Sequence, residues 1–264
     1  MPFVALHGCV HHYQLAGRDD RPALLFANSL GSDLRIWDDL TERLSGHFKI
    51  IRYDHRGHGL SDAPVPPYSA EDLAGDVAAL LDYLAIRQAA LCGVSVGGLI
   101  AQAAAVKYPE RVRALVLSDT GARIGSVESW QQRIEMIQAS GVVSIEKMTM
   151  ERWFSVGFRQ RSPVDVRGYA NMLRQTSSDG YVGTCGALRD GDLSDAVKKI
   201  TCPTLVLCGA EDIATPPELG RELAGLIPGA KFSLIEAAAH LPCVEQPAAM
   251  AERMLEFFRE VQIV

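Results

Sequence analysis

The sequence predicts an α/β fold with a mostly parallel central sheet, an N-terminal β-hairpin and an inserted helical segment. Short apolar runs bounded by turn residues alternate with stretches of helical spacing, which is typical of parallel strands covered by helices on both faces. The 264 residues suffice for one sizeable domain. The composition, 48% hydrophobic and 22% charged, is that of a globular protein.

The expected elements follow in chain order. Phe3–Leu6 and Val10–Leu15 alternate in polarity around a His-Gly turn and predict a β-hairpin. The compact apolar runs that we expect to form the rest of the sheet are Ala23–Ala27, Phe48–Tyr53, Ala89–Cys92, Val112–Ser118, Thr204–Cys208 and Lys231–Ile235. One example of the helical spacing between these runs is the set Leu73, Val77, Leu80, Leu81 and Leu84.

Residues 121–199 break this alternation, because they contain only helical patterns. The patterns lie at Trp130–Ala139, Ile145–Phe154 and Val164–Arg174. Since a strand pattern returns at residue 204, we expect a helical cap inserted between two strands of the sheet. The predicted division is a core of residues 1–120 and 200–264 and a cap of residues 121–199, and the alternative is a separate helical domain.

Charge and composition exclude several functions. A net charge of −6 and a pI near 5.7 do not give the basic face of a nucleic-acid binder, and an anionic substrate would need a local basic pocket. Residues 1–15 lack a basic segment followed by an apolar run, so we expect no signal peptide, and the apolar runs are too short to span a bilayer. The six cysteines form no CxxC pair, which favours reduced thiols in a cytoplasmic protein over disulfides or a metal site.

The strongest motif is Gly93-Val94-Ser95-Val96-Gly97, followed by another glycine. The pattern G-x-S-x-G is weak alone, but here a strand runs into it and the small-residue helix Leu99–Lys107 runs out of it. This strand–turn–helix context indicates a nucleophile elbow, in which glycines avoid clashes around a strained serine. The helix N-terminus also favours developing negative charge. We predict Ser95 as a nucleophile; the alternative is a glycine-rich turn with a capping serine.

A serine hydroxyl needs a base to take its proton, and the base needs an acceptor that holds it in the right tautomer. After such an elbow the acid precedes the histidine in the chain. Of the seven histidines, only His240 lies after Asp212 in the chain. Asp212 and His240 each follow an expected strand, at the edge of the sheet where ligands bind to parallel sheets. We predict Asp212 as the acid and His240 as the base. Rival acids are the neighbouring Glu211 and Asp119, which follows another strand.

We expect other histidines to be structural. Those expected at the surface are His7, His11, His12 and His47. His55 and His58 flank Arg-Gly in the loop after the strand Phe48–Tyr53, which we interpret as a structural loop. The alternative for His55 is a place in the pocket wall.

A tetrahedral intermediate needs two backbone N–H donors aimed at its oxygen. One donor should come from Val96, the residue after the nucleophile, and the other from the turn after the first long strand. That turn is Asn28-Ser29-Leu30-Gly31, and we expect Leu30 to donate.

Five segments together resemble the 3-oxoadipate enol-lactonases of the α/β-hydrolase superfamily. They are Asn28–Gly31, Tyr53–Gly59, Cys92–Gly98, Arg152–Phe154 and Cys185–Leu193. The match runs over nearly the whole chain, cap included. The elbow and the Arg-Gly-His-Gly loop are common to the superfamily, whereas the Asn-Ser-Leu-Gly turn and the cap segments narrow the resemblance to this family.

The resemblance implies hydrolysis of 3-oxoadipate enol-lactone to 3-oxoadipate in bacterial aromatic degradation, the β-ketoadipate pathway. It implies Ser95, Asp212 and His240 as the catalytic triad, and the reaction that it implies needs no metal or organic cofactor. Val96 departs from the family, in which many members have Met, and this departure bears on the pocket wall and the exact lactone.

The substrate implied by the resemblance is a small molecule with a carboxylate, so the cap should supply a cation. Our candidates for substrate binding are Arg133 with Trp130 and Trp153. Arg123 and Arg159 are also available in the cap.

Other functions share these features. A general carboxylesterase, another lactonase or a cofactor-free perhydrolase would use the same triad. A ligand receptor built on a hydrolase fold would keep the fold with little turnover. A haloalkane dehalogenase needs an aspartate where this chain has Ser95.

Overall fold

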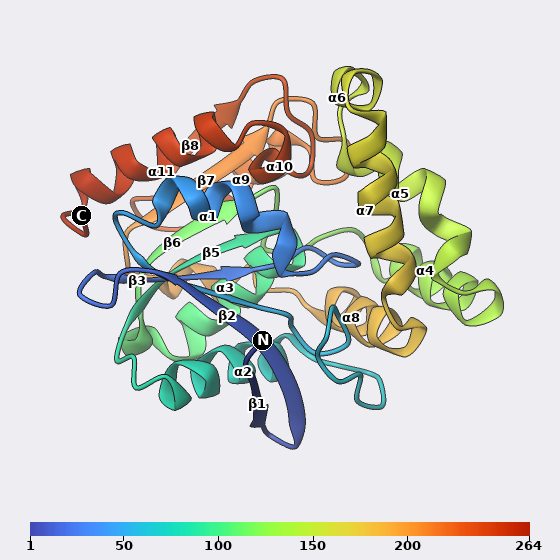
Figure 1. Cartoon of the computed structure of the whole chain (residues 1–264), viewed down its shortest axis with the longest axis horizontal. Helices are drawn as coiled ribbons and strands as arrows, with labels where there is room; N and C mark the ends of the chain where they lie inside the picture. Colours follow the sequence, from blue (N-terminus) through green and yellow to red (C-terminus); the bar gives the residue numbers. More distant parts are fainter.

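Eight strands form one sheet in the order β1-β2-β4-β3-β5-β6-β7-β8 in the computed structural model, which describes residues 1–264 (Figure 1). The strands are β1 (Phe3–Leu6), β2 (Cys9–Gly17), β3 (Ala23–Ala27), β4 (Lys49–Tyr53), β5 (Ala89–Val94), β6 (Val112–Ser118), β7 (Thr204–Gly209) and β8 (Lys231–Ile235). β2 pairs antiparallel with β1 and with β4, and every other pair is parallel. The predicted fold class and N-terminal hairpin are therefore confirmed.

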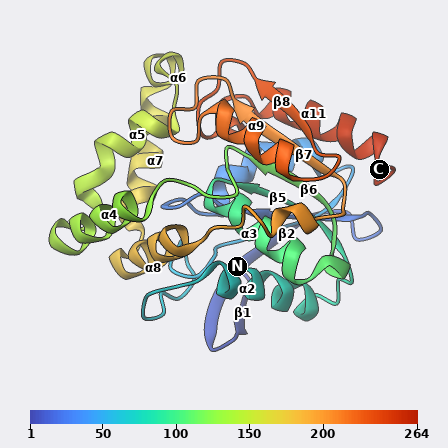
Figure 2. The same ribbon diagram turned by 180° about the vertical axis from the view of Figure 1, so that it is seen from behind.

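Helices cover both faces of the sheet (Figures 1 and 2). In β3, Leu24 and Phe26 belong to a buried cluster with helices α1 and α11, whereas Leu25 and Ala27 belong to a second cluster with α2, α3 and α9. Successive strand side chains point to opposite faces, so an unbroken apolar run serves both clusters. The core helices are α1 (Asp38–Leu44), α2 (Ala70–Tyr83), α3 (Val96–Lys107), α9 (Pro217–Leu226), α10 (Pro242–Glu245) and α11 (Pro247–Glu260).

Five α-helices lie between β6 and β7 and stand to one side of the sheet (Figure 1). They are α4 (Val127–Ser140), α5 (Glu146–Trp153), α6 (Val156–Arg161), α7 (Pro163–Gln175) and α8 (Ser178–Asp190). The sequence patterns predict α4, α5 and α7 to within a few residues. They miss α6, which is short, and α8, because its glycines lower the helical propensity of the segment. Short 3-10 helices lie at Leu34–Trp37, Pro109–Arg111, Val142–Ile145 and Val197–Lys199.

The glycines of α8 let this helix touch the core loops. A Cβ at Gly180 would lie 2.1 Å from the carbonyl oxygen of Gly57, and one at Gly183 would lie 2.6 Å from the ring of Tyr68. Both distances are shorter than real carbon contacts, so any side chain would push the helix away. Backbone-to-backbone contact therefore fixes how α8 sits on the loop after β4.

Two histidines of the hairpin are buried, and the expectation that they lie at the surface is wrong. His11 is 0% exposed and His12 is 3% exposed. Carboxylates cover both sides of β2: Nδ1 of His12 lies 2.8 Å from Oδ2 of Asp54, and Nε2 of His11 lies 3.5 Å from Oδ2 of Asp76. Because neighbouring strand residues point to opposite faces, each imidazole meets its own acid.

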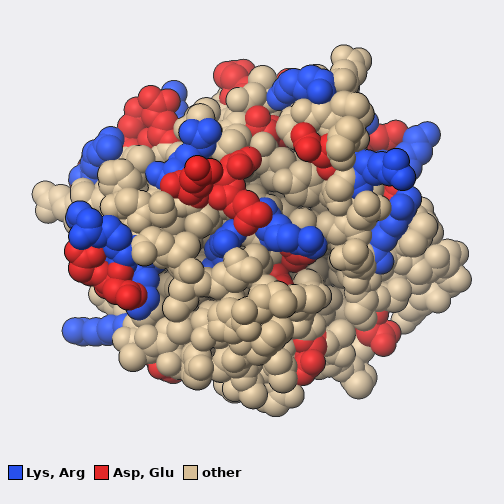
Figure 3. All heavy atoms as spheres, in the orientation of Figure 1, with Lys and Arg blue, Asp and Glu red and all other residues tan.

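Three further features are the distribution of charge, the state of the cysteines and the apolar character of the helices. Positive and negative side chains are interspersed over the face shown in Figure 3. All six cysteines are free thiols, and only Cys202 is partly exposed. None of the helices combines the length and the apolar character that crossing a membrane requires.

Candidate active site

Ser95 occupies a sharp turn between β5 and α3. Its backbone has φ 59° and ψ −119°, a conformation that costs free energy outside glycine. A Cβ at Gly93 would lie 2.1 Å from the carbonyl oxygen of Gly97, and one at Gly97 would lie 2.0 Å from that of Ala27. The two glycines of the motif therefore allow the turn, and the side chain of Ser95 lines a pocket.

The predicted site residues meet at the carboxyl edge of the sheet. Leu30 follows β3, Ser95 follows β5 and Asp212 follows β7, while His240 lies in the loop after β8. These strands are parallel, so segments far apart in sequence leave the sheet at the same edge. Leu30, Ser95 and His240 line one pocket between this edge and the helices α4, α5 and α8.

His240 is joined to Asp212. Nδ1 of His240 lies 2.8 Å from Oδ2 of Asp212, and both side chains are buried. Asp212 also accepts hydrogen bonds from the hydroxyl of Thr215 at 2.6 Å and from the N–H of Ala214 at 2.7 Å. This arrangement fixes Nδ1 as the protonated nitrogen and leaves Nε2 as a base. His240 and Ser95 form no hydrogen bond in this structure, which is common before substrate tightens the geometry.

Asp119 is buried beside Asp212 but does not contact His240. It accepts from the N–H of Gly209 at 2.8 Å and from the hydroxyl of Ser118 at 2.5 Å. Burial and the charge of Asp212 raise the pKa of Asp119 well above its ordinary value. Burial acts in the same direction on Asp212, but the charge and hydrogen bond of His240 outweigh it and lower the pKa of Asp212. The pKa values of the two neighbouring carboxyl groups are thus shifted in opposite directions, which favours the protonated form of Asp119 and the ionised form of Asp212.

Asp119 and Asp212 form a compact group with Cys208, in which the possible ligand atoms lie within 4.8 Å of one another. A metal ion needs deprotonated ligands. Burial raises the pKa of Cys208 as well as that of Asp119, which favours the protonated form of both groups. This group therefore suits a cation poorly.

Two backbone N–H groups beside Ser95 have no hydrogen-bond partner. Val96 is the first residue of α3, where no carbonyl of the helix precedes it. Leu30 lies in the turn after β3, and its N–H is likewise unbonded. The side chain of Asn28 holds this turn by donating to the carbonyl of Tyr53 at 2.9 Å and by accepting from Nε1 of Trp37 at 2.8 Å. Val96 itself is fully buried and is not among the residues that line the pocket.

His58 also supports the turn after β3 that contains Leu30, a role that the sequence analysis does not identify. The N–H of Gly31 donates to Nε2 of His58 at 2.9 Å, and Nδ1 of His58 lies 3.3 Å from the carbonyl of Arg56. Nε2 can accept only in a neutral ring. Burial lowers the pKa of His58 to about 4, which keeps the ring neutral. His55 packs against His58 at 3.9 Å between ring centroids and is 0% exposed, so the alternative that places it in the pocket wall is wrong.

The neutral state of His58 predicts acid sensitivity of the fold. Its pKa falls from an ordinary 6.5 to about 4, so the unfolded chain binds more protons between these values. This contribution to stability is complete above pH 6.5 and is lost as the pH falls toward 4, and it amounts to about 3 kcal/mol. We expect urea unfolding to show a smaller loss of stability over this range in His58→Gln than in the wild-type protein. An unchanged pH dependence in the variant would contradict the assignment.

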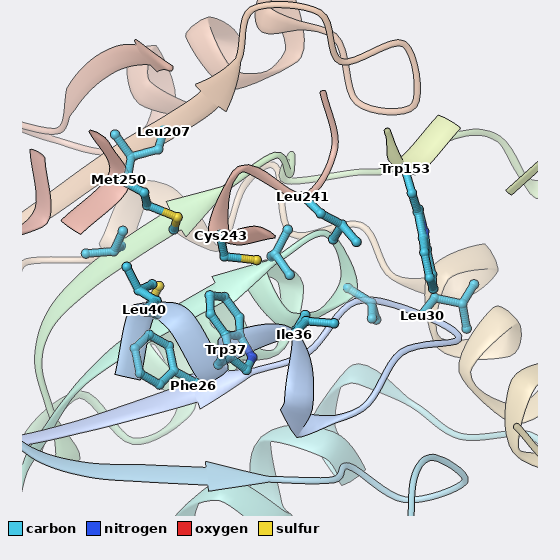
Figure 4. Packing of buried hydrophobic residues seen from close by; sticks show 14 of the residues in the cluster. Phe26, Leu30, Ile36, Trp37, Leu40, Trp153, Leu207, Leu241, Cys243 and Met250 are labelled. Atoms are coloured by element: carbon cyan, nitrogen blue, oxygen red, sulfur yellow. The ribbon is translucent and has the colours of Figure 1, made fainter. Parts of the chain in front are cut away.

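The pocket has a volume of about 420 Å³, which suits a small molecule. The predicted residues Trp130, Arg133 and Trp153 all line it, and Figure 4 shows Trp153 reaching from the cap to Leu30. Its complete lining is Ser29, Leu30, Ser95, Ile124, Gly125, Ser129, Trp130, Gln132, Arg133, Met136, Met148, Thr149, Arg152, Trp153, Tyr181, Ala214, Thr215 and His240. No aspartate or glutamate is among these residues.

The two arginines of the pocket have no acidic partner. The guanidinium of Arg133 has two hydrogen bonds, to the hydroxyl of Tyr181 at 3.4 Å and to the sulfur of Met148 at 3.8 Å. Arg152, which sequence reasoning did not propose for binding, lines the pocket without any ion pair. A pocket with two free guanidinium groups and no carboxylate favours an anionic ligand.

The other candidates from the sequence lie elsewhere. Arg123 pairs with Asp192 at 3.4 Å outside the pocket, and Arg159 does not line it either. Glu211 is exposed and forms no ion pair with His240, whose acidic partner is Asp212. No local pattern separates these residues from Arg133 and Asp212, because the distinction depends on which side of a helix or turn faces the pocket.

Residues 22–140 match the family described as alpha/beta hydrolase fold. The sheet order, the helices inserted between β6 and β7 and the strand–turn–helix serine define the class of the protein as an α/β-hydrolase.

The chain is 39% identical to 3-oxoadipate enol-lactonase 2 of Acinetobacter baylyi over 90% of this chain and 89% of that protein. It is 30% identical to 3-oxoadipate enol-lactonase 1 of the same organism, over 94% of this chain and 93% of that protein. The crystal structure of the enol-lactonase from Burkholderia xenovorans LB400 superposes with a TM-score of 0.95 at 36% identity and covers 98% of this chain and 100% of that one. The chain therefore belongs to the 3-oxoadipate enol-lactonase family, and it is a carboxylic ester hydrolase of the enol-lactonase type.

Proposed function

We propose that this hydrolase opens the small carboxylated lactone 3-oxoadipate enol-lactone to 3-oxoadipate, as a cytoplasmic step of bacterial aromatic degradation. The observation that carries the proposal is the pocket: Ser95 and His240 lie at its floor, and Arg133 and Arg152 lie in its cap-side wall without acidic partners. The similarity to enol-lactonases of other bacteria supports the same substrate. The six free thiols favour a reducing compartment.

In the proposed mechanism, Nε2 of His240 takes the proton of Ser95, whose Oγ attacks the lactone carbonyl carbon. Asp212 holds the other ring nitrogen and stabilises the imidazolium that forms. The N–H groups of Leu30 and Val96 donate to the oxyanion of the tetrahedral intermediate.

Collapse of this intermediate breaks the ring C–O bond and expels the enolate. The enolate takes the proton from the imidazolium, which returns His240 to its neutral form, and the resulting enol tautomerises to the ketone. A water molecule then transfers its proton to His240 and attacks the acyl-enzyme. Breaking the acyl–oxygen bond returns the proton to Ser95 and releases the acid.

We propose that residues 121–199 act as a cap that selects the substrate. Trp130 and Trp153 supply apolar walls for the ring, and the guanidinium of Arg133 faces the substrate carboxylate. A small ester without a carboxylate would use the same floor of the pocket without this contact.

The direct test follows the loss of ultraviolet absorbance of 3-oxoadipate enol-lactone in the presence of the purified protein. Rapid turnover supports the proposal. Hydrolysis of p-nitrophenyl acetate without turnover of the lactone would leave the hydrolase assignment intact and refute the proposed substrate.

The carboxylate contact makes its own prediction. We expect Arg133→Gln to raise KM for the lactone about 10- to 100-fold, because a hydrogen bond to a charged group contributes about 1.5–3 kcal/mol. The rate with neutral p-nitrophenyl acetate should change little. The matched control is Arg123→Gln, which removes a cap arginine that pairs with Asp192 outside the pocket. Equal effects of the two variants would argue against the role of Arg133.

A further inference from the structure

Glu245 links the cap to the loop that carries His240, and no step of the proposed mechanism uses it. We propose that this carboxylate is a positioning residue, which holds the proposed catalytic base and the cap wall of the pocket in register. The inference rests on the proposed role of His240 and adds a residue that acts through it.

The carboxylate of Glu245 is buried and accepts hydrogen bonds from two distant segments. Oε1 accepts from the N–H of Ala239 at 2.7 Å. Oε2 accepts from the hydroxyl of Ser155 at 2.6 Å and from its N–H at 3.2 Å. Glu245 is only 6% exposed, and Ser155 lies 90 positions away in the chain. A single carboxylate therefore joins residues that the sequence separates widely.

Each of the two segments carries a residue of the pocket. Ala239 immediately precedes His240, and Ser155 lies two positions after Trp153. His240 and Trp153 both line the pocket, one from the core and one from the cap. Moving the Glu245 carboxylate would therefore shift the proposed base relative to the wall against which the substrate packs.

The hydrogen bonds of Glu245 matter energetically because its carboxylate is buried. A buried hydrogen-bonding group left without a partner costs about 1–3 kcal/mol, and more when it is charged. The hydroxyl of Ser155 also accepts from the N–H of Phe158 at 3.1 Å, so it caps helix α6 while it donates to Glu245. Asp212 orients the ring of His240 through Nδ1, whereas Glu245 holds the main chain that carries the ring.

The test compares Ser155→Ala and Glu245→Gln with Ser177→Ala. Ser177 is also the N-cap of a cap helix, since its side chain accepts from the N–H of Gly180, but it does not contact Glu245. We expect kcat for p-nitrophenyl acetate to fall about 10- to 100-fold in the first two variants, because small displacements of a reacting group have effects of this size. The Ser177→Ala variant should stay within about twofold of the wild type, although it loses a comparable helix cap.

Combining the changes tests the link itself. If Glu245 acts on His240 through its contact with Ser155, the double variant Ser155→Ala with Glu245→Gln should lose little more activity than Glu245→Gln alone. The inference is overturned if Ser155→Ala and Glu245→Gln lower only the melting temperature and keep the kcat of Ser177→Ala. His240→Ala is the reference: if it retains activity, the proposed function fails and not merely the role of Glu245.

Discussion

Replacing Ser95 by alanine should abolish hydrolysis, with kcat for p-nitrophenyl acetate reduced about a million-fold. The hydroxyl oxygen of Ser95 is the atom that would form the acyl-enzyme. No other nucleophile occupies the turn between β5 and α3. The fold should survive the change, because alanine retains the Cβ and Ser95 donates no side-chain hydrogen bond in the structure. The measurement is kcat by release of p-nitrophenolate, with circular dichroism as the check on folding.

A matched control for this variant is Ser129→Ala, which removes another hydroxyl from the lining of the same pocket. Ser129 belongs to the capping box of α4 and lies far along the chain from the elbow. We expect Ser129→Ala to keep kcat within about tenfold of the wild type, since a lost cap costs about 1 kcal/mol of stability. Retention of activity by folded Ser95→Ala would refute Ser95 as the nucleophile.

The second large effect is expected for Asp212→Asn, which should lower kcat about ten-thousand-fold. Asparagine keeps the shape of the side chain, but its amide cannot accept from the Nδ1–H of His240 and stabilise the imidazolium at once. The hydrogen bond of 2.8 Å that fixes the tautomer would be lost or reversed. The test is kcat measured from about pH 6 to about pH 9, where the variant should stay low throughout.

The same substitution at the neighbouring Asp119 should have a much smaller effect. Burial and the charge of Asp212 raise the pKa of Asp119 and favour its neutral form, so Asp119→Asn should change the local charge little and keep a similar shape. We expect this variant to lose less than about tenfold in kcat, because its contacts are with Gly209 and Ser118 and not with His240. A large loss in Asp119→Asn with activity retained in Asp212→Asn would reverse the assignment of the acid.

Much of the fold could be predicted from local pattern. The strands Phe3–Leu6, Ala23–Ala27, Val112–Ser118 and Lys231–Ile235 have the predicted bounds, and the other strand bounds differ by a few residues at most. Apolar runs and helical spacing depend on the backbone period, which is a property of neighbouring residues. Helix α8 escaped prediction because its glycines are unfavourable locally and are required by contact with Gly57 and Tyr68.

The candidate site likewise has some features that local sequence pattern predicts and others that it does not. The motif around Ser95 and the chain order of Ser95, Asp212 and His240 could be proposed from the sequence because a nucleophile elbow has a local signature. The burial of His11 and His12 and the support of the turn by His58 could not, because each depends on a partner from another segment.

The sequence by itself determined the α/β class, the strands, the serine turn and the set of acids, histidines and arginines available for catalysis and binding. Only the tertiary structure decided that His240 meets Asp212 rather than Asp119, and that Arg133 lies in the pocket while Arg123 lies outside it. It also decided that His58 holds the turn that contains Leu30 and that Glu245 holds the loop that contains His240. The physical reason is the range of the interactions. Backbone propensity acts between near neighbours, whereas burial, hydrogen bonding and pKa shifts arise between groups that meet only when the sheet and its helices pack together.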